Sequence, residues 1–583
     1  MEILRAVFKF VFSLMLFPPA YFFVNKKVVR KNFRIAFPEK EPFFYDILLA
    51  RGIWHFANVL FDAIFGLPDK TLSALINDAR SYGLGVDKTG IIATAHIGSW
   101  EAANLSGAAV FSGKYGVIVN EIKNPLFSLV YRKRASLGAK VFLAGSIKDM
   151  KTLGKEVKAG LSVAVVFDHA GRDGIMARFF TRPAPIPKGI LWLSKSARRD
   201  IVPCLCVYDK GRYRLKVFEP IAWNTRQEEI ARRLNAILEQ EVRAYPWQYL
   251  WTYKRWKFSR QRDVLILSDG KAGHEKQSVA LLSYLREAYP NEEIKASIIK
   301  AQIKKNPLLK LIGFMPLQAG CSLLKKSGLG HLLENNADLI ISTGSSLIGI
   351  NVFLKRFNIA KNAVIMSSGL YSGLIDIKIS MRHDSERIKN GFVIDGALSF
   401  FDENKAQEAA SSLGISRDDY IAVLIGGNAR GYELRGNDVE ALLEVAQEYR
   451  DRVLITTSRR TSPDIEGKVG QGAYRYAVIA NKENPPGVIE AFFYVANKAI
   501  ITPDSISMVS EALNAGLSVG IWAPIMPKRK KFIDFLNGLY KQGLIKFLRT
   551  KQDIRGFIEA KTTKRGPNAK PGLIQYLRSK KAF

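Results

Sequence analysis

The sequence predicts an α/β protein whose several domains follow an N-terminal membrane anchor. The chain has 583 residues, more than one hydrophobic core accommodates, so about two to four domains are expected. Short apolar runs alternate with helical patterns along most of its length, which is typical of α/β folds. An apolar segment near the N-terminus is followed at once by a basic run, which indicates membrane attachment.

The anchor is expected within residues 1–30. The stretch FVFSLMLFPPAYFFV, residues 10–24, is apolar except for one serine. It is short for a span, and Pro18-Pro19 would kink it, but with the residues before it the segment could cross a bilayer when tilted. The basic run NKKVVRKNFR places the downstream domains in the cytoplasm, and no small-residue cleavage site indicates removal. The alternative is a buried core helix.

Four further regions follow the anchor. Residues 31–260 alternate strands and helices in one α/β domain. The pattern restarts at RDVLILSDGKAG and again at YIAVLIGG, which predicts two Rossmann-like modules, 263–415 and 416–560, with a cleft between them. Residues 561–583 form a basic tail, which we expect to be loosely held at the surface.

The net charge of +34 predicts an anionic partner. A membrane, a phosphorylated substrate and nucleic acid all meet that requirement. Nucleic acid is disfavoured because aromatic and cationic residues are not interleaved in any recognised binding motif. Cys204, Cys206 and Cys321 lack metal-ligand spacing, and C-L-C fits a strand, so neither a metal nor another cofactor is expected.

The first candidate site combines His96 and Glu101. His96 ends the apolar run TGIIATAH, and Glu101 lies five positions later in HIGSWE. The two side chains converge if His96 lies in a loop and Glu101 in the first turn of a helix. A neutral histidine whose far nitrogen donates to a carboxylate is a good general base. Alone, the spacing could also occur by chance.

Two further residues join this candidate site. Arg134 lies near the end of the basic stretch NPLFSLVYRKRASLG, and Asp168 follows the strand-like run LSVAVVF. Arg134 could bind a phosphate or a developing oxyanion, although a solvated helix face is the plain alternative. Asp168 could equally form a turn. Because no serine or cysteine nucleophile accompanies them, direct attack by a substrate hydroxyl is the simplest mechanism.

In this order, the motifs of residues 1–257 resemble those of the late acyltransferases of lipid A synthesis, members of the lysophospholipid acyltransferase superfamily. The matching elements are HIGSWE, NP…RASLG, FDHAGRDG…FFTRPAPIPKG, RRDIVP and YPWQYLWTYKRW. The resemblance implies that His96 is the catalytic base and Glu101 its orienting partner, with Arg134 and Asp168 also functional. One position departs from the family pattern: His169 stands where a glutamine is expected.

The same resemblance implies the substrates and the location. The donor would be an acyl-acyl carrier protein and the acceptor a hydroxyl of a lipid A precursor, at the cytoplasmic face of a Gram-negative inner membrane. A basic, membrane-anchored enzyme suits both an acidic carrier protein and an anionic lipid. The matching motifs also supply four residues expected to bind substrate: Asn124, Arg132, Gly171 and Arg182.

In the second half, small residues and hydrogen-bond donors follow three strand-like runs. They occur in LIGGNARGYEL, TTSRRTS and ITPDSISMVSEALNAG, where ligands of α/β proteins bind. The alternative is that the glycines only allow tight turns. LSDGKAGHEKQS could hold a phosphate through Gly270 and Gly273 but lacks the spacing of known phosphate loops. We interpret His274-Glu275 as a loop pair, not a catalytic dyad.

DGKAGHEKQS, TTSRRTS and TPDSISMVSEA resemble a family named for a plant mitochondrial fission protein, over residues 263–545. That family looks like the GT-B glycosyltransferases, which implies a GT-B-like arrangement of the two modules and a nucleotide-sugar ligand. A glutamate there grips the ribose, and Glu511 matches it. The residues expected to bind the nucleotide sugar are Gly426, Gly427, Asn428, Ser458, Asp504, Ser505 and Glu511.

The leading hypothesis is a bifunctional lipid A enzyme in which an acyltransferase is fused to a glycosyltransferase-like module of the same pathway. In the alternatives, the second half is a non-catalytic lipid- or partner-binding module, or the acyl acceptor is another lysolipid. Residues 306–326 are apolar enough to dock on a bilayer, but could also be buried.

Overall fold

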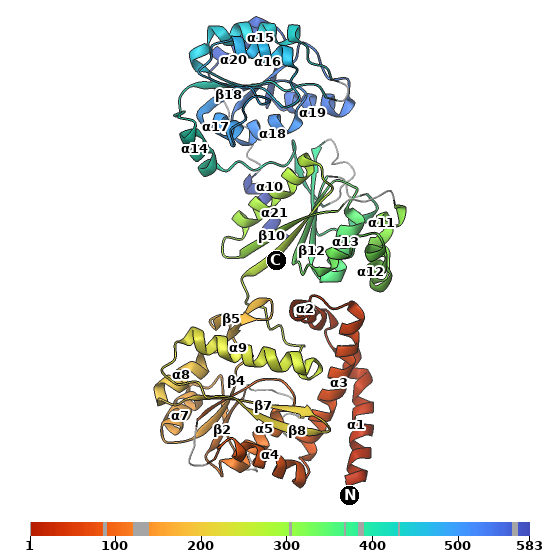
Figure 1. The fold of residues 1–583 in the computed structure, drawn as a ribbon, viewed down its shortest axis with the longest axis vertical. Coiled ribbons are helices and arrows are strands. Elements are labelled where there is room, and N and C mark those ends of the chain that lie inside the picture. The colour runs from red at the N-terminus through yellow and green to blue at the C-terminus, as the bar shows by residue number, and fades with distance from the viewer. Residues whose placement is uncertain are drawn as a thin grey trace. The chain divides into compact units, whose positions relative to one another are not determined.

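The structure is a computed structural model that describes residues 2–85, 90–119, 139–301, 306–366, 369–382, 390–429, 432–561 and 570–583. The chain divides into two compact units, Met1–Gln261 and Arg262–Phe583. Unit 1 contains one large α/β sheet, and unit 2 contains two (Figure 1). The predicted α/β class, with two Rossmann-like modules in a GT-B-like arrangement, is confirmed.

The sheet of unit 1 has the strand order β3-β2-β4-β1-β7-β8. Its neighbours pair in parallel except for β7 and β8, which form an antiparallel hairpin. The strands are β1 (Ile91–Thr94), β2 (Tyr115–Val119), β3 (Ala139–Leu143), β4 (Ser162–Val166), β7 (Ile201–Asp209) and β8 (Arg212–Val217), with a separate hairpin of β5 (Ile175–Phe179) and β6 (Arg182–Ile186). The helices are α1 (Glu2–Phe23), α2 (Lys26–Ala36), α3 (Pro42–Phe65), α4 (Asp69–Ser81), α5 (Trp100–Val110), α7 (Ile147–Lys158), α8 (Lys188–Ala197) and α9 (Gln227–Ala244).

The central strand β1 is buried along its whole length. This is expected of a parallel strand with helices on both faces of its sheet. Residues of α2, α3, α7, α8 and α9 join the core cluster on one face, and residues of α4 and α5 join the other. Because Thr94 pairs with Val166, the carboxyl ends of β1 and β4 lie side by side. The loops after these strands therefore start at adjacent points.

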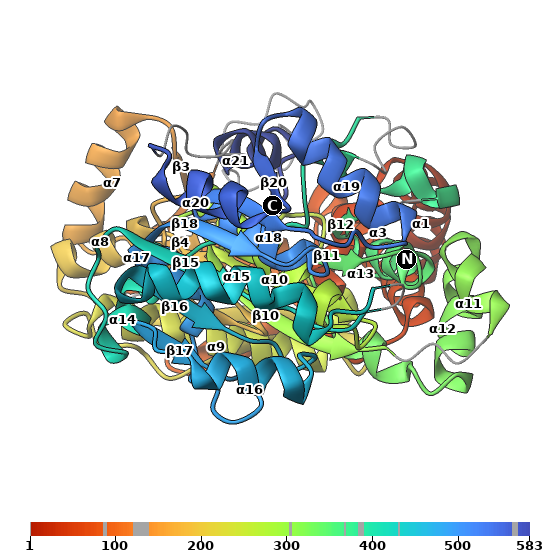
Figure 2. The same ribbon diagram turned by 90° about the horizontal axis from the view of Figure 1, so that it is seen from above.

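Helix α1 lies alongside α3, as Figures 1 and 2 show. Arg5 and Lys9 of α1 both pair with Asp62 of α3, at 3.0 and 2.5 Å. Both helices are long and apolar enough to cross a membrane, where the sequence predicted a single anchor. They differ in exposure: 6% of the apolar window of α1 is buried, against 50% for α3. The exposed apolar surface of unit 1 is therefore concentrated on α1.

The first module of unit 2 has the strand order β10-β9-β11-β12-β13-β14. Helices α10 and α21 cover one face of its sheet, and α12 and α13 cover the other. The strands are β9 (Gln261–Ser268), β10 (Glu293–Lys300), β11 (Leu339–Thr343), β12 (Lys361–Ile365), β13 (Ile377–Met381) and β14 (Phe392–Ile394). The helices are α10 (Ala272–Ala288), α11 (Pro307–Leu311), α12 (Leu317–Lys326), α13 (Ile348–Asn358) and α21 (Lys570–Ser579), with short 3₁₀ turns that include Ile312–Phe314 and Gly369–Leu374.

The second module has a fully parallel sheet in the order β17-β16-β15-β18-β19-β20. Helices α15, α16 and α20 cover one face, and α14, α17, α18 and α19 cover the other. The strands are β15 (Tyr420–Leu424), β16 (Val453–Thr456), β17 (Tyr476–Val478), β18 (Ala496–Ile501), β19 (Ser518–Trp522) and β20 (Ile545–Leu548). The helices are α14 (Glu403–Ser412), α15 (Gly436–Glu448), α16 (Pro463–Gln471), α17 (Val488–Val495), α18 (Ile506–Asn514), α19 (Lys530–Lys541) and α20 (Lys551–Glu559).

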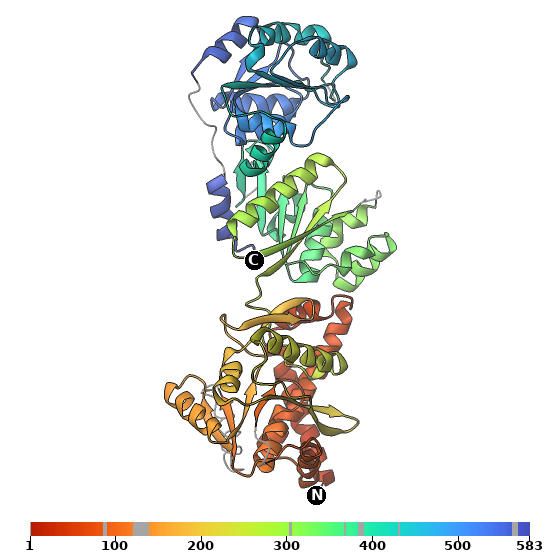
Figure 3. The same cartoon turned by 60° about the vertical axis from the view of Figure 1, so that its left-hand side comes forward.

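The C-terminal residues differ from the sequence-based expectation of a loosely held tail. Helix α21 lies against α10 of the first module, where the dark-blue end of the chain meets the yellow-green helix in Figure 3. Leu573 and Leu577, one helical turn apart, enter the core of that module. The Tyr289 hydroxyl donates to the carbonyl of Leu577 at 2.9 Å. The helix of this C-terminal segment is therefore packed onto the first module and is not loosely held.

Candidate functional site

A histidine and an aspartate meet at the carboxyl ends of β1 and β4 in unit 1. The Nδ1 atom of His96 lies 2.9 Å from Oδ1 of Asp168, and the backbone N–H of His96 donates to both carboxylate oxygens at 3.3 and 3.2 Å. Each residue follows its strand by two positions. The hydrogen bond therefore spans 72 residues of sequence but only two neighbouring strand ends.

The Asp168 side chain is completely buried. Burial alone would raise the pKa of this carboxyl, but the facing His96, with His169 and Arg255, holds the pKa below its ordinary value. Asp168 is therefore ionised at neutral pH and accepts the Nδ1 proton. That assignment leaves Nε2 of His96 as the free acceptor, and it has no hydrogen-bond partner among the described residues.

Three aromatic rings hold the His96 imidazole in place. His169 stacks on it with 4.0 Å between ring centroids, and Tyr253 stacks on His169 at 3.7 Å. Trp100 packs edge-on against His96 at 5.0 Å. Burial lowers the pKa of His169 to about 4, so this ring is neutral at physiological pH. The ligand atoms of His96, Asp168 and His169 lie within 4.8 Å of one another, so a cation could also bind there.

The loop that carries His96 is fixed by backbone contacts on both sides. The N–H of Gly98 donates to the carbonyl of Gln248, and the N–H of Leu250 donates to the carbonyl of His96, both at 2.9 Å. Gly98 has φ +61°, and a Cβ atom there would lie 1.9 Å from the backbone oxygen of Cys206. Only glycine fits this close approach between the loop and β7.

Glu101 lies in the first turn of α5, as predicted, and is buried. The structure differs from the expectation that Glu101 orients His96, because Nδ1 of His96 donates its hydrogen bond to Asp168. The physical reason is the strand order: β4 lies next to β1, so its end supplies a carboxylate beside the ring. A sequence spacing of five residues cannot reveal that neighbour.

The remaining predicted residues of unit 1 have different outcomes. Gly171 lies exposed in the loop after Asp168. Arg182 is buried at the start of β6, and its backbone carbonyl accepts from the indole Nε1–H of Trp256 at 3.3 Å. Its role in substrate binding stays a prediction. Three predicted residues lie outside the described residues: Asn124, Arg132 and Arg134.

Sequence reasoning did not single out Arg255. Its guanidinium is buried and donates to the carbonyl of Pro185 at 2.5 Å and to Oδ1 of Asn235 at 2.8 Å. It is the nearby cation among the groups that lower the pKa of Asp168. The cationic and aromatic composition of WTYKRW signalled importance, but not which of its cations is buried beside the carboxylate.

Unit 2 contains a cavity of about 780 Å³ between its two modules. One wall comes from the start of α10 and the segment around Ser399, and the other from α17, Arg460 and the turn into α18. Three of the predicted residues line it: Asp504, Ser505 and Glu511. This is the place where the carboxyl ends of parallel strands position ligands in α/β folds.

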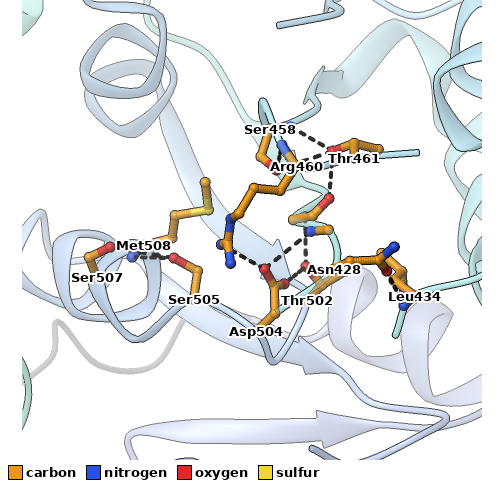
Figure 4. A network of polar contacts seen from close by, with 12 residues as sticks. Asn428, Leu434, Ser458, Arg460, Thr461, Thr502, Asp504, Ser505, Ser507 and Met508 are labelled. Atoms are coloured by element: carbon orange, nitrogen blue, oxygen red, sulfur yellow. Dashed lines mark hydrogen bonds and ion pairs between the residues drawn. The ribbon is translucent and has the colours of Figure 1, made fainter. Parts of the chain in front are cut away.

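Asp504 is the centre of a polar network beside this cavity (Figure 4). It accepts from the Thr502 hydroxyl at 2.7 Å, from the N–H of Gly427 at 3.1 Å and from the Arg460 guanidinium at 3.0 Å. Burial raises the pKa of Asp504. The network fixes the loop after β18 to the loop after β15.

The glycines of LIGGN serve this network instead of lining the cavity as expected. The N–H of Gly426 donates to the Thr502 hydroxyl at 2.7 Å, so both glycine N–H groups are already satisfied. A Cβ at Gly427 would lie 2.0 Å from the carbonyl oxygen of Arg460. Asn428 and Ser458 are similarly engaged, with Leu434 N–H at 3.0 Å and the Thr461 hydroxyl at 3.2 Å.

Ser505 immediately precedes helix α18, and Glu511 lies within it. Ser505 caps α18 and accepts from the N–H of Met508 at 3.4 Å. Glu511 lies 3.7 Å from Nζ of Lys276, which comes from the other module. Burial raises the pKa of Glu511. A carboxylate and a lysine from opposite walls therefore meet inside the cavity.

Comparison with known families confirms both resemblances predicted from the sequence. The family described as bacterial lipid A biosynthesis acyltransferase matches residues 78–258, and that described as mitochondrial fission ELM1 matches residues 272–565. No curated protein matches the chain.

Solved structures resemble the chain in fold alone. They include UDP-GlcNAc 2-epimerase from Neisseria meningitidis bound to UDP-GlcNAc, at 12% identity over 55% of this chain and 100% of that one, with TM-score 0.34. The UDP-GlcNAc 2-epimerase from Methanocaldococcus jannaschii has 11% identity over 55% and 99%, with TM-score 0.35. E. coli heptosyltransferase WaaC has 13% identity over 51% and 99%, with TM-score 0.31.

Proposed function

Because the chain belongs to the mitochondrial fission ELM1 family and carries a bacterial lipid A biosynthesis acyltransferase domain, we propose that it is a membrane-bound enzyme with two transferase sites. The site in unit 1 moves a fatty acyl chain from acyl-acyl carrier protein to a hydroxyl of a lipid A precursor. The observation that carries this proposal is the 2.9 Å hydrogen bond between His96 and the buried Asp168.

In the proposed mechanism, Nε2 of His96 takes the proton of the acceptor hydroxyl. The hydroxyl oxygen attacks the thioester carbonyl, a C–O bond forms, and the C–S bond breaks. His96 then returns the proton to the leaving thiolate. Asp168 stabilises the imidazolium that forms between these steps, because the buried carboxylate cannot move away and water does not screen it. Arg134 is proposed to bind a phosphate of the acceptor or the developing oxyanion.

Because the proposed acceptor is a lipid, we propose that this site works at a membrane. Helix α1 is the proposed anchor in the bacterial inner membrane, with both units in the cytoplasm, because its apolar surface is exposed and basic α2 follows it directly. Deletion of residues 2–24 should release most of the protein from membranes, and salt should release the rest, since each Lys or Arg near an anionic surface contributes ~1 kcal/mol. Retention that neither treatment reduces would contradict this proposal.

The cavity of unit 2 is the proposed nucleotide-sugar site. Its volume suits a ligand of that size, and Arg460 offers a cation for a diphosphate. Glu511 is the proposed acceptor for the ribose hydroxyls. The alternative, a non-catalytic lipid- or partner-binding module, is favoured by the satisfied N–H groups of Gly426 and Gly427, which leave fewer free donors for a diphosphate.

Both transfers add a defined mass to a lipid. Full-length protein is incubated with acyl-acyl carrier protein, a panel of nucleotide sugars and a lipid A precursor, and the lipids are analysed by mass spectrometry. The proposal predicts one product heavier by an acyl group and another heavier by a sugar. Acyl addition without any sugar addition would favour the binding-module alternative, and absence of both would overturn the proposal.

A further inference from the structure

A second histidine–aspartate pair lies in unit 2, on the wall of its cavity. Asp269 directly follows β9, and His274 lies in the first turn of α10. The Nδ1 atom of His274 is 3.0 Å from Oδ2 of Asp269. The imidazole lines the cavity, and its side chain is 22% exposed. The hydrogen bond found at the acyl-transfer site therefore recurs at the proposed sugar-transfer site.

The aspartate of this pair is held firmly. Besides His274, it accepts from the backbone N–H and the Nζ of Lys271, at 3.2 and 3.0 Å, and from the Ser346 hydroxyl at 3.3 Å. Burial would raise the pKa of Asp269, but these hydrogen bonds from Lys271, together with His274, hold the pKa below its ordinary value. Asp269 is thus a carboxylate that accepts the Nδ1 proton.

The imidazole ring is also restrained on another side. Gly344 has φ +83°, and a Cβ atom at this position would lie 2.8 Å from Cε1 of His274. The backbone after β11 therefore packs against the ring. With Nδ1 on Asp269 and one edge against Gly344, the remaining nitrogen, Nε2, has no hydrogen-bond partner within the described part of the chain.

We infer that His274 is the general base of the second reaction, with Asp269 as its positioning residue. This inference rests on the proposed function of the cavity. Nε2 takes the proton of an acceptor hydroxyl, and the oxygen forms a bond to the anomeric carbon of the sugar. The bond from that carbon to the phosphate oxygen breaks, and the nucleoside diphosphate leaves with the electron pair. The proton then passes from His274 to solvent.

The lining indicates the class of acceptor. Apolar side chains share the cavity with the charged ones: Met366, Met381, Phe400 and Phe493. An amphipathic acceptor, with a hydroxyl for His274 and an apolar part for these side chains, fits that mixture. We therefore assign the acceptor as a glycolipid hydroxyl, and not the hydroxyl of a free sugar.

The test uses full-length protein in detergent, a panel of radiolabelled UDP-, GDP-, CDP- and dTDP-sugars, and lipid A precursor as the acceptor probe. Label in the organic phase measures transfer, and calorimetry measures nucleotide binding. For His274→Ala we expect transfer to fall by ~10²–10⁴-fold, the range of general base catalysis, with the nucleotide Kd changed less than twofold. If His274→Ala is unstable, His274→Gln, which keeps a side chain of similar size, takes its place. It should show the same loss of transfer.

The pH profile separates catalysis from a structural role. Asp269→Asn removes the charge that stabilises the imidazolium, so the acid limb of the transfer rate should move to lower pH. Lys271 loses its ion pair with Asp269 in this variant. The other ionisable side chains that line the cavity keep their identity: Glu275, Lys276, Asp402, Lys405, Arg460, Glu490, Asp504 and Glu511. Glu433→Gln, which neutralises an exposed carboxylate outside the cavity lining, is the matched control and should leave the acid limb in place.

Three distinguishable outcomes overturn the inference. If His274→Ala transfers sugar within threefold of the wild-type rate, the base assignment fails while the proposed function stands. If the wild-type protein neither binds nor transfers any sugar of the panel, the proposed function of the cavity fails and the inference fails with it. Equal loss of transfer and of nucleotide binding in His274→Gln would also contradict a role limited to proton transfer.

Discussion

The two histidine–aspartate pairs have similar hydrogen-bond lengths but different surroundings. His96 and Asp168 come from two neighbouring strand ends 72 residues apart. The aspartate is completely buried, and the ring of His169 stacks on His96. His274 and Asp269 come from one strand–helix connection, five residues apart, on the wall of an open cavity. The same histidine–aspartate hydrogen bond can therefore be formed between two strand ends far apart in sequence or within one strand–helix connection. The first pair has a buried aspartate, and the second lies beside a cavity.

The largest effects are expected when each histidine is replaced by alanine in turn. His96→Ala should lower acyl transfer by ~10²–10⁴-fold because the base is lost, and should leave nucleotide binding by unit 2 unchanged. His274→Ala should lower sugar transfer by a similar factor, because the second base is lost, and should leave acyl transfer and nucleotide binding unchanged. Both activities are measured on each purified full-length variant. Loss of both activities in either variant would show that the pairs are not independent sites.

The next effect concerns the glycine that lets the His96 loop approach β7. Gly98→Ala should destabilise the protein by ~1–3 kcal/mol or more, since the added Cβ meets a backbone oxygen at a positive φ. Thermal unfolding measures the change. Gly189→Ala in α8, where a Cβ meets nothing within 4 Å, is the control and should not lower stability. Wild-type stability in Gly98→Ala would contradict the described loop.

A smaller effect is expected at Glu511 in the cavity. Glu511→Gln keeps the shape but loses a charged acceptor, which is worth ~1.5–3 kcal/mol against ~1 for a neutral one, so nucleotide binding should weaken by about tenfold. Calorimetry on full-length protein measures it. Glu433→Gln, an exposed carboxylate outside the cavity lining, should bind as the wild type does. Undiminished binding in Glu511→Gln would remove this residue from the proposed site.

The smallest effect expected is from metal removal. His96, Asp168 and His169 could share a cation, but Nδ1 of His96 is already hydrogen-bonded to Asp168, and the proposed mechanism needs only Nε2. Dialysis against EDTA should therefore leave acyl transfer within twofold of the untreated rate, and added Zn²⁺ or Mg²⁺ should not raise it. A rate restored only by a divalent ion would replace the general-base account of unit 1.

The fold class and the position of His96 could be predicted from sequence because periodicity and strand-end residues are local signals. Its partner could not, because the adjacency of β1 and β4 is a property of the strand order. His96 and Glu101 are five residues apart, and that spacing suggested a hydrogen-bonded pair that does not form on Nδ1. Asp269 and His274 have the same spacing and do form such a pair. Chain spacing alone does not distinguish these two cases.

The same limit applies to the residues expected at the nucleotide-sugar site. Asp504, Ser505 and Glu511 line the cavity, because the turn after a strand and the helix it begins are local features. The direction of the N–H groups of Gly426 and Gly427 was not predictable, since it depends on the neighbouring β18 and the carboxylate after it. The sequence was sufficient to locate the loop after β15. The hydrogen bonds of its N–H groups depend on tertiary contacts with Thr502 and Asp504.

The most direct test of the central claim is a double-mutant cycle on acyl transfer with His96→Ala, Asp168→Ala and the double variant. If Asp168 acts through His96, the double variant should lose no more activity than His96→Ala alone, because residues that act as a unit are strongly non-additive. Losses that multiply, or near-normal turnover by Asp168→Ala, would contradict the claim that this buried pair is the acyl-transfer base.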